Sequence, residues 1–271
     1  MEDPSPFVSS VHAALREDLV KKPLLTLALS VLAATPALAQ INLAWRNCIT
    51  VTSGPNAGKM NQNSACDGTV VGFPGATYYA VVSFIAPANV TSFVGAKAIL
   101  EVYAPQPTLP DYWRHGVGEC RETSFSAGFT SGLGTGATGT CQDPYDGTVT
   151  REWTSISERP CADRATYTVQ LTRESARLLT PGQQYMANTL VFDTNHAGDG
   201  VCPGCEIPAY LVVRQVEINQ TSPLPTIVLP NPDVRNWVVW QGGSPELDGG
   251  ACGHPVPTRN HTWGAIKAIY R

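Results

Sequence analysis

Apolar and polar residues alternate with a period of two along several stretches of this chain. In the clearest stretch, Ala165–Thr172, the residues Tyr167, Val169 and Leu171 share one face, and threonine and glutamine residues share the other. This period is typical of a strand with one buried face in an antiparallel sheet. Similar runs, rich in β-branched and aromatic residues and bounded by Gly, Pro, Asn or Asp, predict seven strands: Asn42–Cys48, Thr77–Ala86, Ala96–Tyr103, Ala165–Thr172, Gln184–Asp193, Ala209–Ile218 and Asn236–Gln241.

The strand pattern predicts an all-β fold, an antiparallel β-sandwich of the immunoglobulin/fibronectin-like or jelly-roll type. The segment Leu179–Tyr185 resembles the corner of such sandwiches in which a tyrosine at the start of a strand hydrogen-bonds back along the chain. A plain Pro-Gly turn followed by a core tyrosine explains the segment equally well. Near the C-terminus, the spacing of Trp263 and Ile266 within Asn260–Arg271 predicts a short helix.

Between residues 105 and 165 the alternation gives way to a stretch rich in Gly, Thr, Ser and Pro. A loop of this length usually carries a function or is disordered. Its three cysteines favour a loop held to the fold by disulfides: Cys120, Cys141 and Cys161. We therefore expect one β-sandwich domain over residues 40–271 with an insertion at 105–165. The 24 glycines, 22 prolines and only 15% charged residues favour turns and strands over long helices.

The N-terminal region has the pattern of a secretion signal. Two lysines precede the apolar run Leu24–Ala34, and small residues then offer a cleavage site after Ala39. We expect a signal peptide over residues 20–39 and an extracytoplasmic location, periplasmic or secreted. Residues 1–19 carry acidic groups where a signal has basic ones, so we interpret them as a wrongly assigned extension, with translation starting at Val20. The apolar run is too short to span a bilayer, so we expect no membrane insertion.

All eight cysteines follow the expected cleavage site. An even number in an exported chain indicates disulfides. Local loop closure favours the pairs Cys48–Cys66 and Cys120–Cys141, and it assigns no partners to the remaining four: Cys161, Cys202, Cys205 and Cys252. The formal net charge of −4, without a basic cluster, excludes the electrostatic footprint of a nucleic-acid-binding protein.

Five motifs occur in order along the chain: Leu43-Ala44-Trp45 followed by Cys48; Leu109-Pro110-Asp111-Tyr112-Trp113 with Gly118-Glu119-Cys120-Arg121; Cys141-Gln142-Asp143-Pro144-Tyr145; Cys202-Pro203-Gly204-Cys205; and Thr258–Gly264 with the residues that follow it. Together they resemble the motifs of a family of exported bacterial proteins of uncharacterised function. The resemblance implies an extracytoplasmic location and one shared disulfide-bonded fold. It implies no activity.

The insertion contains the residues most suited to binding a ligand. Tyr112 and Trp113 would form an aromatic platform for a sugar or an apolar ligand, and packing into the core is the alternative for both rings. The nearby carboxylates are Asp111, Asp143 and Asp146. Two of them would serve as the acid and base of a glycoside hydrolase only within about 10 Å of each other.

Metal sites and nucleophilic catalysis have weaker support in the sequence. Calcium binding by the aspartates remains an alternative, although Asx turns explain their spacing equally well. Zinc binding by Cys202-x-x-Cys205 would need ligands such as His196, Cys252 or His254, and an oxidising compartment would instead convert the thiols to disulfides. The chain has no Gly-x-Ser-x-Gly elbow. We therefore predict no metal, no cofactor and no catalytic residue.

These observations predict an exported, non-catalytic structural or binding protein of the bacterial envelope or extracellular space. One alternative is a carbohydrate-binding module or glycoside hydrolase that uses the aromatic and acidic residues of the insertion. Another is a self-assembling subunit of a surface layer or fibre, which would need an unpaired strand edge or a donated terminal segment. The corresponding partners are a glycan and further copies of the chain.

Overall fold

Strands dominate the part of the chain described by the computed structural model, which comprises residues 41–46, 48, 61–68, 77–122, 124–129, 141–157, 161–229 and 236–244. All of these residues belong to the compact unit Ala39–Arg271. In chain order the elements are β1 (Ile41–Trp45), β2 (Asn61–Gln62), β3 (Tyr78–Ile85), β4 (Phe93–Tyr103), the 3-10 helix η1 (Asp111–Trp113), β5 (Phe125–Gly128), β6 (Arg151–Ser157), β7 (Arg164–Arg177), β8 (Gln184–Phe192), β9 (Ala209–Gln220), β10 (Ile227–Leu229) and β11 (Trp237–Trp240).

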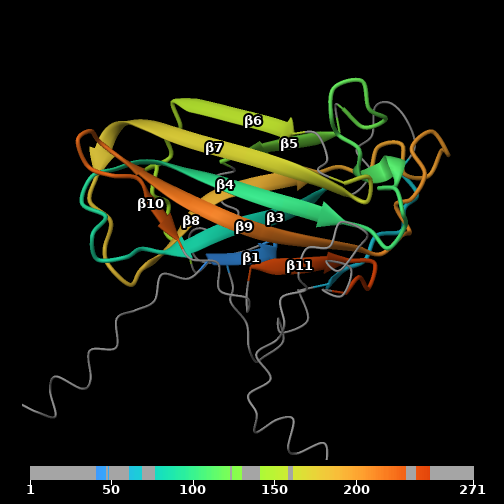
Figure 1. Ribbon diagram of the computed structural model, residues 1–271, viewed down its shortest axis with the longest axis horizontal. Helices are drawn as coiled ribbons and strands as arrows, with labels where there is room; N and C mark the ends of the chain where they lie inside the picture. Colours follow the sequence, from blue (N-terminus) through green and yellow to red (C-terminus); the bar gives the residue numbers. More distant parts are fainter. Residues whose placement is uncertain are drawn as a thin grey trace, which may run out of the picture. The chain divides into compact units, whose positions relative to one another are not determined.

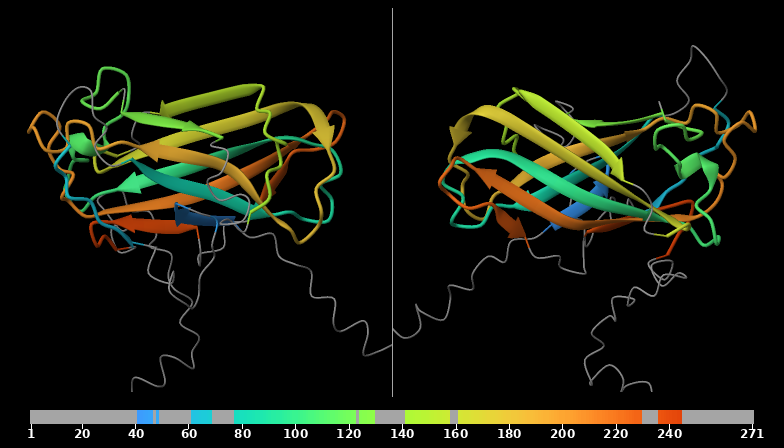
Figure 2. Two further views of the ribbon diagram at one scale, coloured as in Figure 1. Left: turned by 180° about the vertical axis from the view of Figure 1, so that it is seen from behind. Right: turned by 45° about the horizontal axis from the view of Figure 1, so that its top comes forward.

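The strands form two stacked sheets (Figure 1). The smaller sheet has the order β1-β3-β8-β5, and the larger has the order β2-β11-β9-β4-β7-β6, with β10 paired to β9. Described strand neighbours are antiparallel except β11 and β2, which pair in parallel. Figure 2 shows the layers from two further sides. The fold is therefore an antiparallel β-sandwich, as the alternation predicted.

Alternation along each strand decides which side chains fill the space between the sheets. In β7 the burial pattern follows the predicted period of two, with Tyr167, Val169 and Leu171 fully buried. Large rings fill the centre of the core, where Trp240 lies 6.0 Å from Trp45 between ring centroids. Truncating a buried ring of this size typically costs about 3–5 kcal/mol, so these side chains are major contributors to stability.

All seven predicted strands are present, with ends shifted by a few residues. The strands β2, β5, β6 and β10 were not predicted from the sequence. Two of these, β5 and β6, lie within the stretch 105–165, and each is an edge strand of a different sheet. The stretch therefore extends both sheets. The sequence pattern did not indicate these edge strands, because β6 has few apolar residues and β5 contains only four residues.

The turn before β8 is the predicted tyrosine corner. The Tyr185 hydroxyl accepts a hydrogen bond from the backbone N–H of Thr180 at 2.9 Å. Between these residues Gly182 has a φ of +78°, a left-handed conformation that glycine adopts at little cost. The N–H of Gly182 donates to the carbonyl of Ala86, which fixes the turn against the end of β3.

Three disulfides link cysteines that are distant in the sequence. They join Cys48 to Cys141, Cys66 to Cys205 and Cys120 to Cys202, across sequence separations of 93, 139 and 82 residues. The locally closed pairs Cys48–Cys66 and Cys120–Cys141 were therefore wrong predictions. Loop-closure entropy favours short loops only while the chain is unfolded, whereas strand pairing decides which cysteines meet in the fold. Cys161 is also disulfide-bonded, and Cys252 lies outside the described residues.

The pairing also excludes the zinc alternative, because Cys202 and Cys205 form separate disulfides and have no thiolate to offer a metal. The expected extension 1–19, signal peptide 20–39 and C-terminal helix 260–271 all lie outside the described residues. Within the described part of the chain, no helix has the length and apolar character needed to cross a membrane.

Candidate binding surface

Tyr112 and Trp113, the predicted aromatic platform, lie in the core. Both side chains are 0% exposed. The ring of Trp113 packs edge-on against Trp240 and Phe192, with 5.6 Å between ring centroids in each case. Neither ring can stack on a ligand from solvent. The prediction of an aromatic platform is therefore wrong, and the alternative, packing of both rings into the core, is correct.

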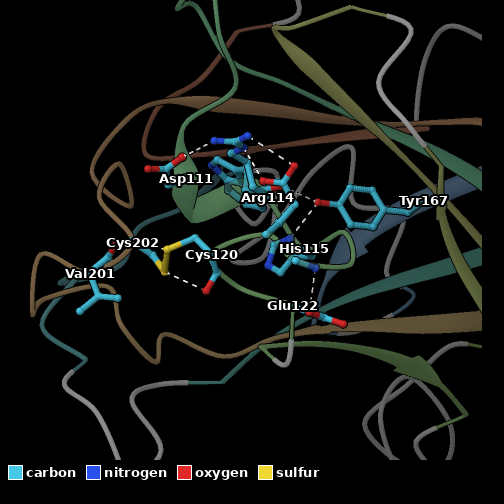
Figure 3. A network of polar contacts seen from close by, with 11 residues as sticks. Asp111, Arg114, His115, Cys120, Glu122, Tyr167, Val201 and Cys202 are labelled. Carbon is cyan, nitrogen blue, oxygen red and sulfur yellow. Dashed lines mark hydrogen bonds and ion pairs between the residues drawn. A yellow bond between two sulfur atoms is a disulfide. The ribbon is translucent and has the colours of Figure 1, made fainter.

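Asp111 belongs to an ion-pair network beside the Cys120–Cys202 disulfide (Figure 3). Its carboxylate lies 2.7 Å from Arg114, and the same guanidinium lies 2.7 Å from Glu119. All three side chains retain solvent exposure, so each pair contributes little to stability, typically about 0–1 kcal/mol. The network nevertheless fixes Asp111 against an arginine and leaves it unsuited to a role as a general base.

Asp143 and Asp146 stabilise a loop at the start of β8. The two carboxylate oxygens of Asp143 each accept a backbone N–H at 2.6 Å, from Tyr145 and Gly147, which makes an Asx-type turn. The carboxylate of Asp146 accepts hydrogen bonds from both Arg173 and Arg177. The turn alternative to a calcium loop therefore accounts for this segment. Among the described residues, no group of three or more His, Cys, Asp or Glu side chains could hold a metal ion.

The predicted carboxylates do not all meet at one site, because Asp143 and Asp146 share one turn and Asp111 lies far from it. Asp146 contacts Arg177, which pairs with Phe93 at the first residue of β4. Asp111 lies beyond the other end of β4, where Ala104 bonds to the chain just before β7. The 11 residues of β4 span about 33 Å, so Asp111 is far outside the roughly 10 Å needed for acid and base catalysis with Asp146.

One histidine, His115, lies in the core, which the sequence did not predict. His115 is 2% exposed, and its Nδ1 lies 2.9 Å from the Tyr167 hydroxyl, which donates to the Trp113 carbonyl at 2.9 Å. Burial, together with the charge of Arg121, lowers the pKa of His115 to about 3. A neutral histidine that is 2% exposed and packed among aromatic rings is unsuited to act as a general base for an external substrate.

The accessible polar surface with an aromatic centre lies over β6 and β7. A shallow groove there is lined from both strands. Trp153 is 53% exposed and stands opposite Gln170, and Arg151 stands opposite Thr172. Alternation directs these side chains away from the core, because the neighbouring β7 positions Val169 and Leu171 are buried. We call Arg151, Trp153, Gln170, Thr172 and Glu174 the β6–β7 face.

Next to this face, an acidic side chain lies on the inner side of β6, between β6 and β5. Glu152 stands opposite the buried Leu171 and therefore points to the inner side of β6. Its carboxylate lies against β5, where a Cβ on Gly128 would approach it to 2.7 Å. Partial burial raises the pKa of Glu152. A charge pointing inward from an edge strand opposes the addition of another strand to that edge.

The β6–β7 face was not predicted from the sequence. The only available signal was the segment Arg151–Ser157, in which Trp153 and Ile156 stand among polar residues without alternating with them. Such a short, mostly polar run resembles a loop as much as a strand, and neither Gln170 nor Thr172 could be placed beside it without the register of β6 against β7.

The geometry defines the molecule as a disulfide-linked antiparallel β-sandwich whose described residues form a polar outer face with an aromatic centre over β6 and β7. Its sequence matches no protein-family model and no curated protein. Among solved structures, it is similar to a cohesin module from a family 33 glycoside hydrolase of Clostridium perfringens, with 7% identity, 65% of this chain and 87% of that chain covered, and a TM-score of 0.29.

Two further solved structures are similar to this chain, again with low sequence identity and low TM-scores. The sixth cohesin of scaffoldin B from Acetivibrio cellulolyticus has 9% identity, covering 71% of this chain and 93% of that chain, with a TM-score of 0.30. The collagen-binding subdomain of the Enterococcus faecalis surface protein ACE has 8% identity, covering 64% and 90%, with a TM-score of 0.22. At such low TM-scores these similarities carry no argument about function, and the fold assignment rests on the strand pairing.

Proposed function

We propose that the protein is an exported, non-catalytic binding protein that meets its partner through the β6–β7 face. The face combines a half-exposed ring with donor and acceptor side chains on a rigid pair of strands. Binding sites placed on strands hold their side chains more precisely than sites placed on loops. The paired cysteines support export, because disulfides persist mainly in oxidising compartments outside the cytoplasm.

The observation that carries the proposal is the exposure of Trp153. Among the described residues, it is the aromatic member of the exposed large hydrophobic side chains, and the others are valines and leucines. Of the other described tryptophans, Trp45, Trp113 and Trp240 are at most 1% exposed, and Trp237 is partly buried. Tryptophan is enriched in binding hot spots because one ring supplies a large contact area at low entropic cost.

Two alternatives have less support in the geometry. A glycoside hydrolase built on Asp111, Asp143 and Asp146 would need free carboxylates that lie close together. Asp111 lies at the other end of β4 from Asp143 and Asp146, and all three are held by arginines or backbone N–H groups. Self-assembly through the β6 edge would place a second strand beside the inward-pointing charge of Glu152, which opposes it.

Hydroxyl-radical footprinting tests the proposal even while the partner is unidentified. Purified protein would be oxidised alone and again with envelope and extracellular material from its source organism. We expect Trp153 to be protected several-fold in the mixture, while Leu178, 69% exposed and outside the face, oxidises equally in both samples. Equal oxidation of Trp153 in the two samples would show that the face meets no partner and would overturn the proposal.

A further inference from the structure

We infer that the ligand of the β6–β7 face is a neutral polysaccharide, with one sugar ring stacked on Trp153. This inference rests on the proposed function and specifies its partner. The apolar faces of sugar rings pack on flat aromatic side chains, and their hydroxyl groups need donors and acceptors at the ring edges. The face supplies both kinds of contact on one pair of strands.

The neighbours of Trp153 suit a ring with hydroxyl groups around it. Gln170 stands directly opposite in the antiparallel register, and side chains in such positions have Cβ atoms about 4.5–5.5 Å apart. Its amide offers both a donor and an acceptor, which a hydroxyl can use at once. Thr172 and Arg151 form the next cross-strand pair, so polar groups continue along the strands from the ring.

The charges of the groove favour a neutral ligand over a polyanion. The groove contains two arginines, Arg151 and Arg173, and two glutamates, Glu152 and Glu174. Arg173 already binds Asp146 and the carbonyl of Pro144, at 2.9 and 2.7 Å. Glu152 points to the inner side of β6, so the charges left on the outer face are Arg151 and Glu174, which balance. The face therefore offers an acidic polysaccharide or a nucleic acid no net positive charge to bind.

An extended peptide is the competing ligand, because β6 is the last strand of its sheet. Adding a strand there would bring a side chain of the peptide next to Glu152 on the inner side of the sheet. Partial burial already raises the pKa of that carboxyl, and covering it with a strand that brings no cation would remove more of its hydration at a free-energy cost. A sugar chain lying across the outer face avoids this contact, so the geometry favours the glycan.

Affinity electrophoresis in native gels tests the inference. The purified mature chain, residues 40–271, would be run through gels containing soluble neutral polysaccharides, namely hydroxyethyl cellulose, xyloglucan, dextran and soluble starch, and through gels containing the polyanion alginate. We expect at least one neutral polymer to retard the protein and alginate to leave it unchanged. Trp153→Ala should weaken the retardation about tenfold, whereas Trp153→Tyr should recover part of it.

The controls separate loss of the ring from loss of the fold. Leu178→Ala removes an exposed side chain outside the face and should bind as the wild type does, and Gln170→Ala should weaken binding while keeping the ring. No retardation by any neutral polymer, retardation by alginate alone, or unchanged binding by Trp153→Ala would each overturn the glycan assignment. If Trp153 is still protected in the footprinting experiment, the binding face stands and its partner is a peptide or protein.

Discussion

Protonation of His115 is the most stringent test of the core at the η1 end of the sandwich. Its ring packs against three aromatic rings at centroid distances from 5.4 to 6.0 Å, those of Phe125, Tyr167 and Phe192. Because the Tyr167 proton goes to the Trp113 carbonyl, Nδ1 of His115 is the donor in the His115–Tyr167 bond. Nε2 is buried without a hydrogen-bond partner, so a second proton would place an unhydrated charge in the core.

The size of the effect follows from the pKa difference between the folded and unfolded chain. The pKa of His115 is about 3 in the fold, against 6.5 for an exposed histidine. The unfolded chain therefore takes up the proton first as the pH falls. The stability associated with neutral His115 is complete above about pH 6.5 and is lost as the pH falls towards 3. Between about pH 7.5 and about pH 4 the loss is about 3 kcal/mol.

The variant His115→Phe isolates this loss, because phenylalanine keeps the ring and cannot take up a proton. Near pH 7.5 the variant should be less stable by about 1 kcal/mol through the lost hydrogen bond to Tyr167. Near pH 4 it should be more stable than the wild type, since the difference shifts by about 3 kcal/mol. Urea unfolding at both pH values, with disulfides intact, measures the shift.

The control is Leu178→Ala, which removes an exposed apolar side chain and leaves every ionisable group in place. The stability difference between this variant and the wild type should be the same at both pH values, because the substitution changes no proton-binding group. If the stability difference between wild type and His115→Phe is the same at both pH values, the reasoning from burial is refuted.

Three further variants test the turns and cross-links. Replacing Cys120 and Cys202 together by alanine should lower the free energy of urea unfolding by about 4 kcal/mol, the chain-entropy value for their separation of 82 residues, and an unchanged midpoint would contradict this. Tyr185→Phe removes the acceptor of the Thr180 N–H and should cost about 1 kcal/mol in the same assay; wild-type stability would show that the corner contributes nothing. Gly204→Ala should lower the melting temperature, because φ is +106° and the new Cβ would lie 2.5 Å from a proline carbon. Equal melting temperatures would argue against this strained backbone.

The elements predicted correctly are those whose evidence is local. The alternation in β7 and the sequence before Tyr185 each contain, within a few residues, the signal for the structure they form. The disulfides could not be predicted in this way. Cys66 lies in the chain after β2 and meets Cys205 only because β9 and β11 bring their ends together, and no local rule states that pairing.

The two candidate aromatic sites show why local polarity did not locate the binding surface. Trp113 and Trp153 both stand among polar residues, Asp-Tyr-Trp-Arg-His and Arg-Glu-Trp-Thr-Ser, yet one is fully buried and the other is 53% exposed. The polar neighbours of Trp113 find partners within the fold, since Arg114 binds Asp111 and His115 binds Tyr167.

The difference between the two tryptophans therefore arises from tertiary contacts. The N–H of Tyr112 bonds to Pro203, beside the Cys120–Cys202 disulfide, and this contact fixes η1 so that the ring of Trp113 enters the core. No described strand lies beyond β6, so nothing in the described structure covers Trp153 in the same way. An aromatic residue with polar neighbours is thus a candidate binding residue when those neighbours lack partners, and within the described part of the chain Arg151 and Gln170 meet this condition whereas Arg114 and His115 do not.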